Sequence, residues 1–162
     1  MTYYPYNRVA LKAELRRDEA LRRKLYNDRD GKEHQSAVGK LTVGVGWNIE
    51  DKGLPEDVIE TLLDRGIDEA EETLDRIEHR WRLLSVRDQA RARALLNMAF
   101  NLGEHRLREF KKMWAALANF FATGSADWWT EAAREALDSA WARQVGPRAQ
   151  RIATVFKTGA LA

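Results

Sequence analysis

The stretch from Leu25 to Ile49 differs in residue pattern from the rest of the chain and limits where a sheet can form. It carries four glycines, and its segment KLTVGVGW at 40–47 alternates β-forming residues with glycine, which is typical of short antiparallel strands and tight turns. Beyond Pro55, apolar residues recur at helical spacing. The sequence therefore predicts a mainly helical α+β fold, with a small N-terminal β-sheet lobe over about residues 15–55 and a larger helical lobe over about 56–162.

The length of 162 residues suits a single domain. Residues 8–18 are expected to form an N-terminal helix that packs on the helical lobe, with Val9, Leu11 and Leu15 at helical spacing. The chain contains no cysteine, which excludes disulfides and thiolate metal sites, and its three histidines lack metal-site spacing. We therefore expect no metal and no cofactor.

Several further helices are expected beyond Pro55. The first has an apolar stripe, made of Val58, Ile59, Leu62, Leu63, Ile67 and Leu74. A second opens at Ser85, whose spacing to Asp88 resembles a capping box, and stops at Gly103. Its segment ALLNMAF is apolar nearly all round, which predicts the buried centre of the domain. Helices over 104–124, 126–141 and 147–156 complete the lobe, and the five tryptophans of this region are expected to pack its core.

Acidic and basic residues are unevenly distributed, although the net charge is only +2. Residues 50–78 contain twelve acids and three bases, a charge of −9, so the rest of the chain carries +11. Such asymmetry suggests a cationic surface that meets an anionic partner. Solvated helix faces explain it equally well.

Glu19 and Asp28 are two carboxylates with unlike expected surroundings. Glu19 lies near the predicted C-terminus of the first helix, where the helix dipole disfavours negative charge and so favours the neutral acid. Asp28 lies in the polar run NDRDG, where it can stay ionised. Such a pair meets the requirement for acid–base catalysis at neutral pH. Taken alone, both residues are more often surface charges.

Four segments in a fixed order carry a resemblance to a known family. They are DEALRRKLYND, which places eight residues between Glu19 and Asp28, then LTVGVG, ALLNMAFNLG and WARQVGPRAQRIATVFKTG. Together they resemble the phage-type lysozymes, the endolysin muramidases, from about Leu15 to Gly159. The resemblance implies a lysozyme-like fold with a cleft between the lobes. It also implies hydrolysis of the β-1,4 bond between N-acetylmuramic acid and N-acetylglucosamine in peptidoglycan.

The resemblance also implies catalytic roles for particular residues. Glu19 matches the general acid that protonates the leaving sugar. Asp28 matches the carboxylate that stabilises the oxocarbenium-like transition state or activates water, and Thr42 matches the threonine that helps to place this water. Arg148 matches an arginine that pairs with the catalytic glutamate.

Substrate-binding positions follow from the same resemblance. Asp30 stands at an acidic position that borders the sugar groove, and Phe100 and Asn101 match groove-lining positions. Trp47 replaces a histidine that many members carry, and it either stacks on a sugar face or packs structurally.

One departure from the family concerns the second carboxylate. Thirteen residues separate Asp28 from Thr42, where the family usually has five. An insertion of about eight residues in the hairpin explains this at small cost in stability. Whether Asp28, Asp30 or Glu33 faces the groove stays open, as does an inverting or a retaining outcome.

The resemblance to endolysins further implies a biological setting. Because the sequence shows no export signal, we expect storage in the host cytoplasm and release to the periplasm and cell wall through a holin-type membrane partner. We expect a monomer that acts on peptidoglycan glycan strands and binds no nucleic acid. The alternatives are a lytic transglycosylase on the same bond and a non-catalytic protein that binds wall polymer or nucleic acid.

Overall fold

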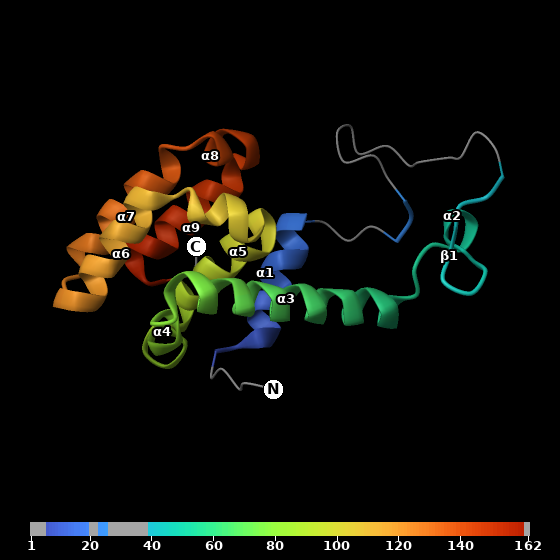
Figure 1. Ribbon diagram of the computed structural model, residues 1–162, viewed down its shortest axis with the longest axis horizontal. Helices are drawn as coiled ribbons and strands as arrows, with labels where there is room; N and C mark the ends of the chain where they lie inside the picture. The colour runs from blue at the N-terminus through green and yellow to red at the C-terminus, as the bar shows by residue number, and fades with distance from the viewer. Residues whose placement is uncertain (1–5, 20–22, 26–38, 161–162) are drawn as a thin grey trace.

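The computed structural model describes residues 6–19, 23–25 and 39–160 of the chain (Figure 1). Its elements in chain order are α1 (Arg8–Glu19), β1 (Thr42–Val43), β2 (Trp47–Asn48), α2 (Ile49–Lys52), α3 (Glu56–Glu78), α4 (Trp81–Arg87), α5 (Gln89–Arg108), α6 (Lys111–Thr123), α7 (Asp127–Leu137), α8 (Ala140–Val145) and α9 (Pro147–Thr158). The predicted mainly helical α+β class is confirmed. Within the described ranges, no helix is long and apolar enough to cross a membrane.

Helix α5 forms the centre of the helical lobe, as the sequence predicted. Leu95, Leu96 and Met98 on this helix are fully buried. Helices α3, α4 and α9 pack around α5, and α7 packs between α6 and α9. Helix α1 lies along this assembly, whereas α3 extends beyond it and leads back to the β1–β2 hairpin (Figure 1).

Aromatic side chains fill the core between the outer helices. Trp129 is fully buried, and its ring centroid lies 5.2 Å from those of both Phe120 and Phe156. Trp81 and Trp141 are also buried, and the remaining two tryptophans of the lobe pack against the core while partly exposed. The predicted role of these five tryptophans is confirmed.

The β1–β2 hairpin confirms the strand prediction on a small scale. Val43 pairs with Trp47 and Thr42 with Asn48 in an antiparallel register. The connecting turn needs glycine because Gly44 and Gly46 have φ values of 60° and 79°, a region that side chains with a Cβ disfavour.

Several helix boundaries differ from the sequence-based expectation. Asp88 rather than Ser85 caps α5, because the Asp88 carboxylate accepts a hydrogen bond from the Arg91 backbone N–H while Ser85 is buried inside α4. The predicted stop at Gly103 is a break in helical geometry (φ 66°, ψ 173°), after which helical turns resume and run to Arg108. The predicted helix over 104–124 is therefore divided, and its second part begins at Lys111 as α6. The predicted helix over 126–141 is split at Ser139, whose hydroxyl caps α8.

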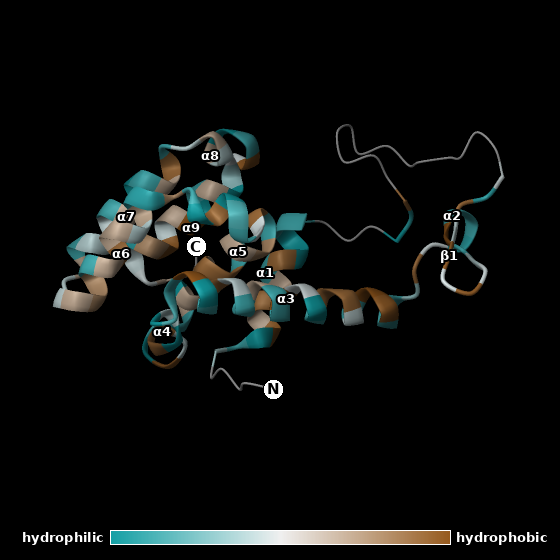
Figure 2. Ribbon diagram, viewed as in Figure 1, coloured by the Kyte–Doolittle hydropathy of each residue, from teal (hydrophilic) through white to brown (hydrophobic). Residues whose placement is uncertain are grey.

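Two predicted apolar stripes include residues that the structure leaves exposed. Leu11 and Leu15 of α1 are buried, but Val9 is 79% exposed because it falls on the opposite side of the helix. Ile67 and Leu74 of α3 are buried, whereas Val58 and Leu62 lie in the first turns, where α3 extends beyond the helical lobe (Figure 2).

Gly66 sets how closely α3 approaches α5. A Cβ atom at this position would lie 2.5 Å from Cε2 of Phe100, which is on α5. Contacts this short do not occur between packed carbon atoms, so only glycine fits without movement of the ring.

We predict that Gly66→Ala lowers the free energy of unfolding by about 1–3 kcal/mol, as overpacking does. The usual effect has the opposite sign, since alanine in a helix interior is favoured over glycine by about 0.5–1 kcal/mol. Chemical denaturation monitored by circular dichroism measures the change. In a Phe100→Leu background the same substitution should be neutral or stabilising, and a loss of stability there would contradict the packing explanation.

Candidate active site

Glu19 is the last residue of α1, and two side chains from the helical lobe hold its carboxylate. Arg148 Nη1 donates a hydrogen bond of 2.6 Å to Glu19 Oε1, and Asn101 Nδ2 donates one of 3.3 Å to the same oxygen. The Glu19 side chain is 40% exposed, whereas that of Arg148 is 6% exposed. A carboxylate open to solvent is thus fixed by a buried cation, and the predicted pairing of Arg148 with Glu19 is confirmed.

Helices α5 and α9 position these partners. Asn97 and Asn101 are four residues apart, so both face α1 from one side of α5. Arg148 lies in the first turn of α9, directly after Pro147, and its Nε donates a 2.8 Å hydrogen bond to Asn97 Oδ1. Asn97 therefore fixes the Arg148 guanidinium, which in turn donates a hydrogen bond to Glu19.

Asp18 lies beneath the contacts that Glu19 makes with Arg148 and Asn101. The sequence analysis did not identify it as a site residue. Its side chain is 1% exposed, accepts a hydrogen bond of 3.0 Å from Asn97 and forms ion pairs with Arg17 and Arg151. Burial by itself would raise the pKa of Asp18, but the hydrogen bonds from Arg17, Arg151 and Asn97 outweigh it and lower this pKa below its ordinary value. A buried carboxylate is thus kept ionised directly before Glu19.

The Asp18 carboxylate also affects Arg148. Its Oδ2 lies 3.9 Å from Arg148 Nε, so the guanidinium charge is shared between Asp18 and Glu19. The sequence signal that could have found this network is the Asp18–Glu19 pair together with two arginines three residues apart, Arg148 and Arg151.

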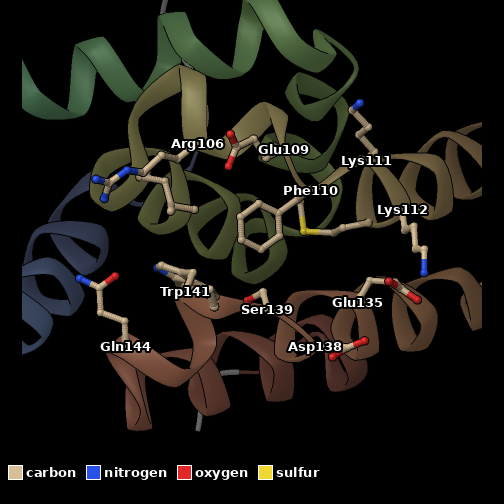
Figure 3. A pocket seen from close by; sticks show the side chains of 13 residues that line it. Arg106, Glu109, Phe110, Lys111, Lys112, Glu135, Asp138, Ser139, Trp141 and Gln144 are labelled. Atoms are coloured by element: carbon tan, nitrogen blue, oxygen red, sulfur yellow. The ribbon is translucent and has the colours of Figure 1, made fainter.

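A pocket of about 730 Å³ adjoins the site through Trp141. The Trp141 indole N–H donates a 2.8 Å hydrogen bond to Asn101 Oδ1, which orients the Asn101 amide so that its NH₂ group faces Glu19. The pocket lies between α5–α6 and α7–α8, with Phe110 directed into it from the first pair of helices and Trp141 from the second (Figure 3).

The rim of this pocket carries charges of both signs (Figure 3). The charged lining residues are Arg106, Glu109, Lys111, Lys112, Glu135 and Asp138. A pocket of this size with aromatic walls and convergent polar groups has the usual character of a ligand site. It lies within the helical lobe, and the cleft predicted between the lobes stays a prediction.

Among the described residues, the predicted Thr42 and Trp47 do not lie beside Glu19. The Thr42 hydroxyl donates to the Lys40 carbonyl, and the Trp47 indole donates to the Gly53 carbonyl at 2.9 Å. Both lie in the hairpin beyond the N-terminal end of α3, away from α1 (Figure 1). Lys52 Nζ lies 4.8 Å from the Trp47 ring centroid, so one face of this ring has a protein partner.

Two further predictions concern α5 and the loop before the hairpin. Phe100 is partly buried, and its ring packs on Gly66. Asp28, Asp30 and Glu33 lie outside the described residues. The roles proposed for them, and for Thr42, Trp47 and Phe100, stay predictions.

Comparison with known proteins gives a distant similarity along nearly the whole chain. No protein-family model matches. Over 170 aligned residues the chain is 24% identical to probable T4-type lysozyme 1 and 26% identical to probable T4-type lysozyme 2, both from Dictyostelium discoideum. Each match covers 94% of this chain and 96% of the relative. The similarity therefore points to a T4-lysozyme-like family, with which the observed α+β fold is consistent.

We predict that Asp18→Asn lowers the free energy of unfolding at pH 7 by about 3–5 kcal/mol, the usual cost of removing one partner from a buried ion pair. Because the pKa of Asp18 is lowered in the folded state, its contribution is fully present above the unfolded value near 4 and is lost as pH falls through the folded value. The difference between wild type and variant should therefore shrink below about pH 4. Denaturant titrations at several pH values, with Glu69→Gln on the exposed face of α3 as control, test this.

Proposed function

We propose that this protein is a muramidase, which hydrolyses the β-1,4 bond between N-acetylmuramic acid and N-acetylglucosamine in peptidoglycan. The observation that carries the proposal is the exposed Glu19 carboxyl group, fixed by Arg148 and Asn101 at the end of α1. The similarity to two probable T4-type lysozymes supports it.

In the proposed reaction, Glu19 protonates the glycosidic oxygen of the leaving sugar. Both described hydrogen bonds reach Oε1, which leaves Oε2 to carry the proton. The positive charge of Arg148 is partly neutralised by Asp18, so Glu19 is not the sole anion that this guanidinium faces. Positioned proton transfer of this kind typically accelerates a reaction by about 10²–10⁴-fold.

The pocket beside Trp141 is the proposed binding site for the part of the wall polymer next to the scissile bond. Aromatic walls suit the apolar faces of sugar rings, and the mixed charges of the rim suit the amino and carboxyl groups of wall peptides. The excess of basic residues outside 50–78 would draw the protein to the anionic wall, less strongly as salt increases.

The remaining parts of the proposal rest on the sequence. Asp28 is the proposed second carboxylate, and Thr42 the proposed ligand of the attacking water. We further propose an endolysin role, in which a monomer is stored in the host cytoplasm and reaches the wall through a holin-type membrane partner.

We predict that Glu19→Gln reduces the rate of cell-wall lysis by at least about 10²-fold, because it removes the acidic proton while keeping the shape of the side chain. The measurement is the loss of turbidity of chloroform-treated Gram-negative cells. Glu69→Gln, an equal change on the exposed face of α3, should lyse walls as wild type does. Lysis by the Glu19→Gln variant at the wild-type rate would overturn the acid assignment.

Mass spectrometry of the wall digest separates this proposal from its rivals. Glu19 is open to solvent, whereas the neighbouring Asp18 carboxylate is buried and ion-paired, so a single working glutamate, as in a lytic transglycosylase, would also suit the described residues. A hydrolase releases reducing muramic ends, whereas a transglycosylase releases cyclised ones. Tight binding to walls without any released product would favour a non-catalytic protein.

Separate alanine substitutions should identify the second carboxylate. We expect Asp28→Ala to abolish lysis and Asp30→Ala and Glu33→Ala to retain most of it, because Asp28 keeps the family spacing to Glu19. Initial lysis rates of the three variants, compared at equal wall binding, provide the test. Loss of activity in either of the latter two alone would show that the insertion places a different carboxylate in the groove.

A further inference from the structure

Helix α1 carries charges of opposite sign on two sides. Arg8, Lys12 and Arg16 recur every four residues and therefore lie on one face. Glu14 and Asp18 lie on another face, and the buried Leu11 and Leu15 lie between the two. Leu11 and Leu15 are the buried residues of this helix, so its charged faces contribute much of what fixes its position.

The basic face pairs with α3 in an antiparallel ladder. At one end Arg8 Nη2 lies 2.7 Å from Asp68 Oδ1, and Arg8 Nη1 lies 3.1 Å from Glu71 Oε1. One turn later, Lys12 Nζ lies 2.7 Å from Asp64 Oδ1 and 3.3 Å from a Glu60 oxygen.

The last rung of this ladder joins Arg16 to Glu60, one turn before Glu19. The acidic side of α1 meets the helical lobe instead. Arg93 Nε lies 3.0 Å from Glu14 Oε1, and both side chains are largely buried. Asp18 meets Asn97 and the arginines of α9. Ion pairs on these two sides thus fix α1 between α3 on one side and α5 and α9 on the other.

These two sets of interactions together determine the position of Glu19. A slide of α1 along α3 by one turn, about 5.4 Å, could rebuild part of the ladder, but it would separate Asp18 and Glu19 from Asn97 and Arg148. Rotation of α1 would break the ladder and the Asp18 network together. The ion-pair ladder with α3 and the contacts of Asp18 and Glu19 can therefore form together only in the observed register of α1.

We propose that Arg8, Lys12 and Arg16 are positioning residues, which act through α1 to hold Glu19 against Arg148 and Asn101. This inference rests on the proposed function for its effect on activity, but its structural part can be tested without it. It also assigns a role to part of the strongly acidic segment 50–78, which the site itself does not use.

The test is a reversal of charge followed by its compensation. Lys12→Glu/Arg16→Glu places acids opposite Glu60 and Asp64, and the quadruple variant with Glu60→Lys/Asp64→Lys restores opposite pairs at positions 12 and 16 and the wild-type net charge. Arg8 loses its ion pair with Asp64 in the quadruple variant but keeps those with Asp68 and Glu71. We expect the double variant to lose about 10- to 100-fold in kcat, the effect of a small misplacement of a catalytic group. The quadruple variant should recover most of it.

Two controls separate positioning from attraction to the wall and from unfolding. Arg87→Glu/Lys157→Glu changes the net charge as the double variant does, but on exposed residues away from α1, so it should alter KM without lowering kcat. If the double variant does not fold, Lys12→Gln/Arg16→Gln removes the cations without adding repulsion and should show the same kcat loss in smaller degree.

A spectroscopic readout keeps the inference independent of activity. The Trp141 indole N–H donates to Asn101, which contacts Glu19, so its NMR resonance reports on this site. The resonance should shift in the double variant and return in the quadruple variant, even if the wild type hydrolyses no wall. An unchanged resonance and kcat in the folded double variant, or a loss that compensation fails to restore, would overturn the positioning role.

Discussion

The pairing of Arg148 with Glu19 is the interaction on which the candidate site depends. It joins the last residue of α1 to the first turn of α9 across 129 positions of sequence, and the guanidinium is itself held by Asn97 and Asp18. Because Arg148 is almost fully buried, its charge needs these partners. The same contacts that satisfy a buried cation therefore place a carboxyl group at the surface, next to a pocket large enough for a sugar-sized ligand.

The acidic segment around α3 has a structural explanation that its composition did not reveal. Glu60, Asp64, Asp68 and Glu71 pair with basic residues of α1, so much of the charge asymmetry is matched inside the molecule. The cationic surface available to an anionic partner is accordingly smaller than the count over the remaining residues suggests. A short helix with two buried leucines is fixed between two charged surfaces, which is how it can carry a reactive group at its end.

Local patterns predicted most of the fold for identifiable reasons. Residues 42–48 form a hairpin because Gly44 and Gly46 adopt positive φ, and α5 lies at the centre because its segment ALLNMAF is apolar nearly all round. Boundaries were predicted less well: Asp88 caps α5, although Ser85 offered a similar signal. Local sequence cannot decide between two adjacent caps, because the burial of Ser85 depends on how α4 packs.

By itself, the sequence predicted a short antiparallel hairpin in a mainly helical chain, the buried central helix and the pairing of Glu19 with Arg148. Periodicity and glycine placement act over a few residues, and the arginine followed from a family resemblance. Only the tertiary structure revealed Asp18, Asn97 and Arg151 beneath Glu19 and the ladder between α1 and α3. These contacts join residues 79 to 133 positions apart, or two helices whose charges look solvated in isolation. Which charges face each other is decided by helix packing, so adjacent acids and regularly spaced arginines identify their partners only once the helices that carry them are packed together.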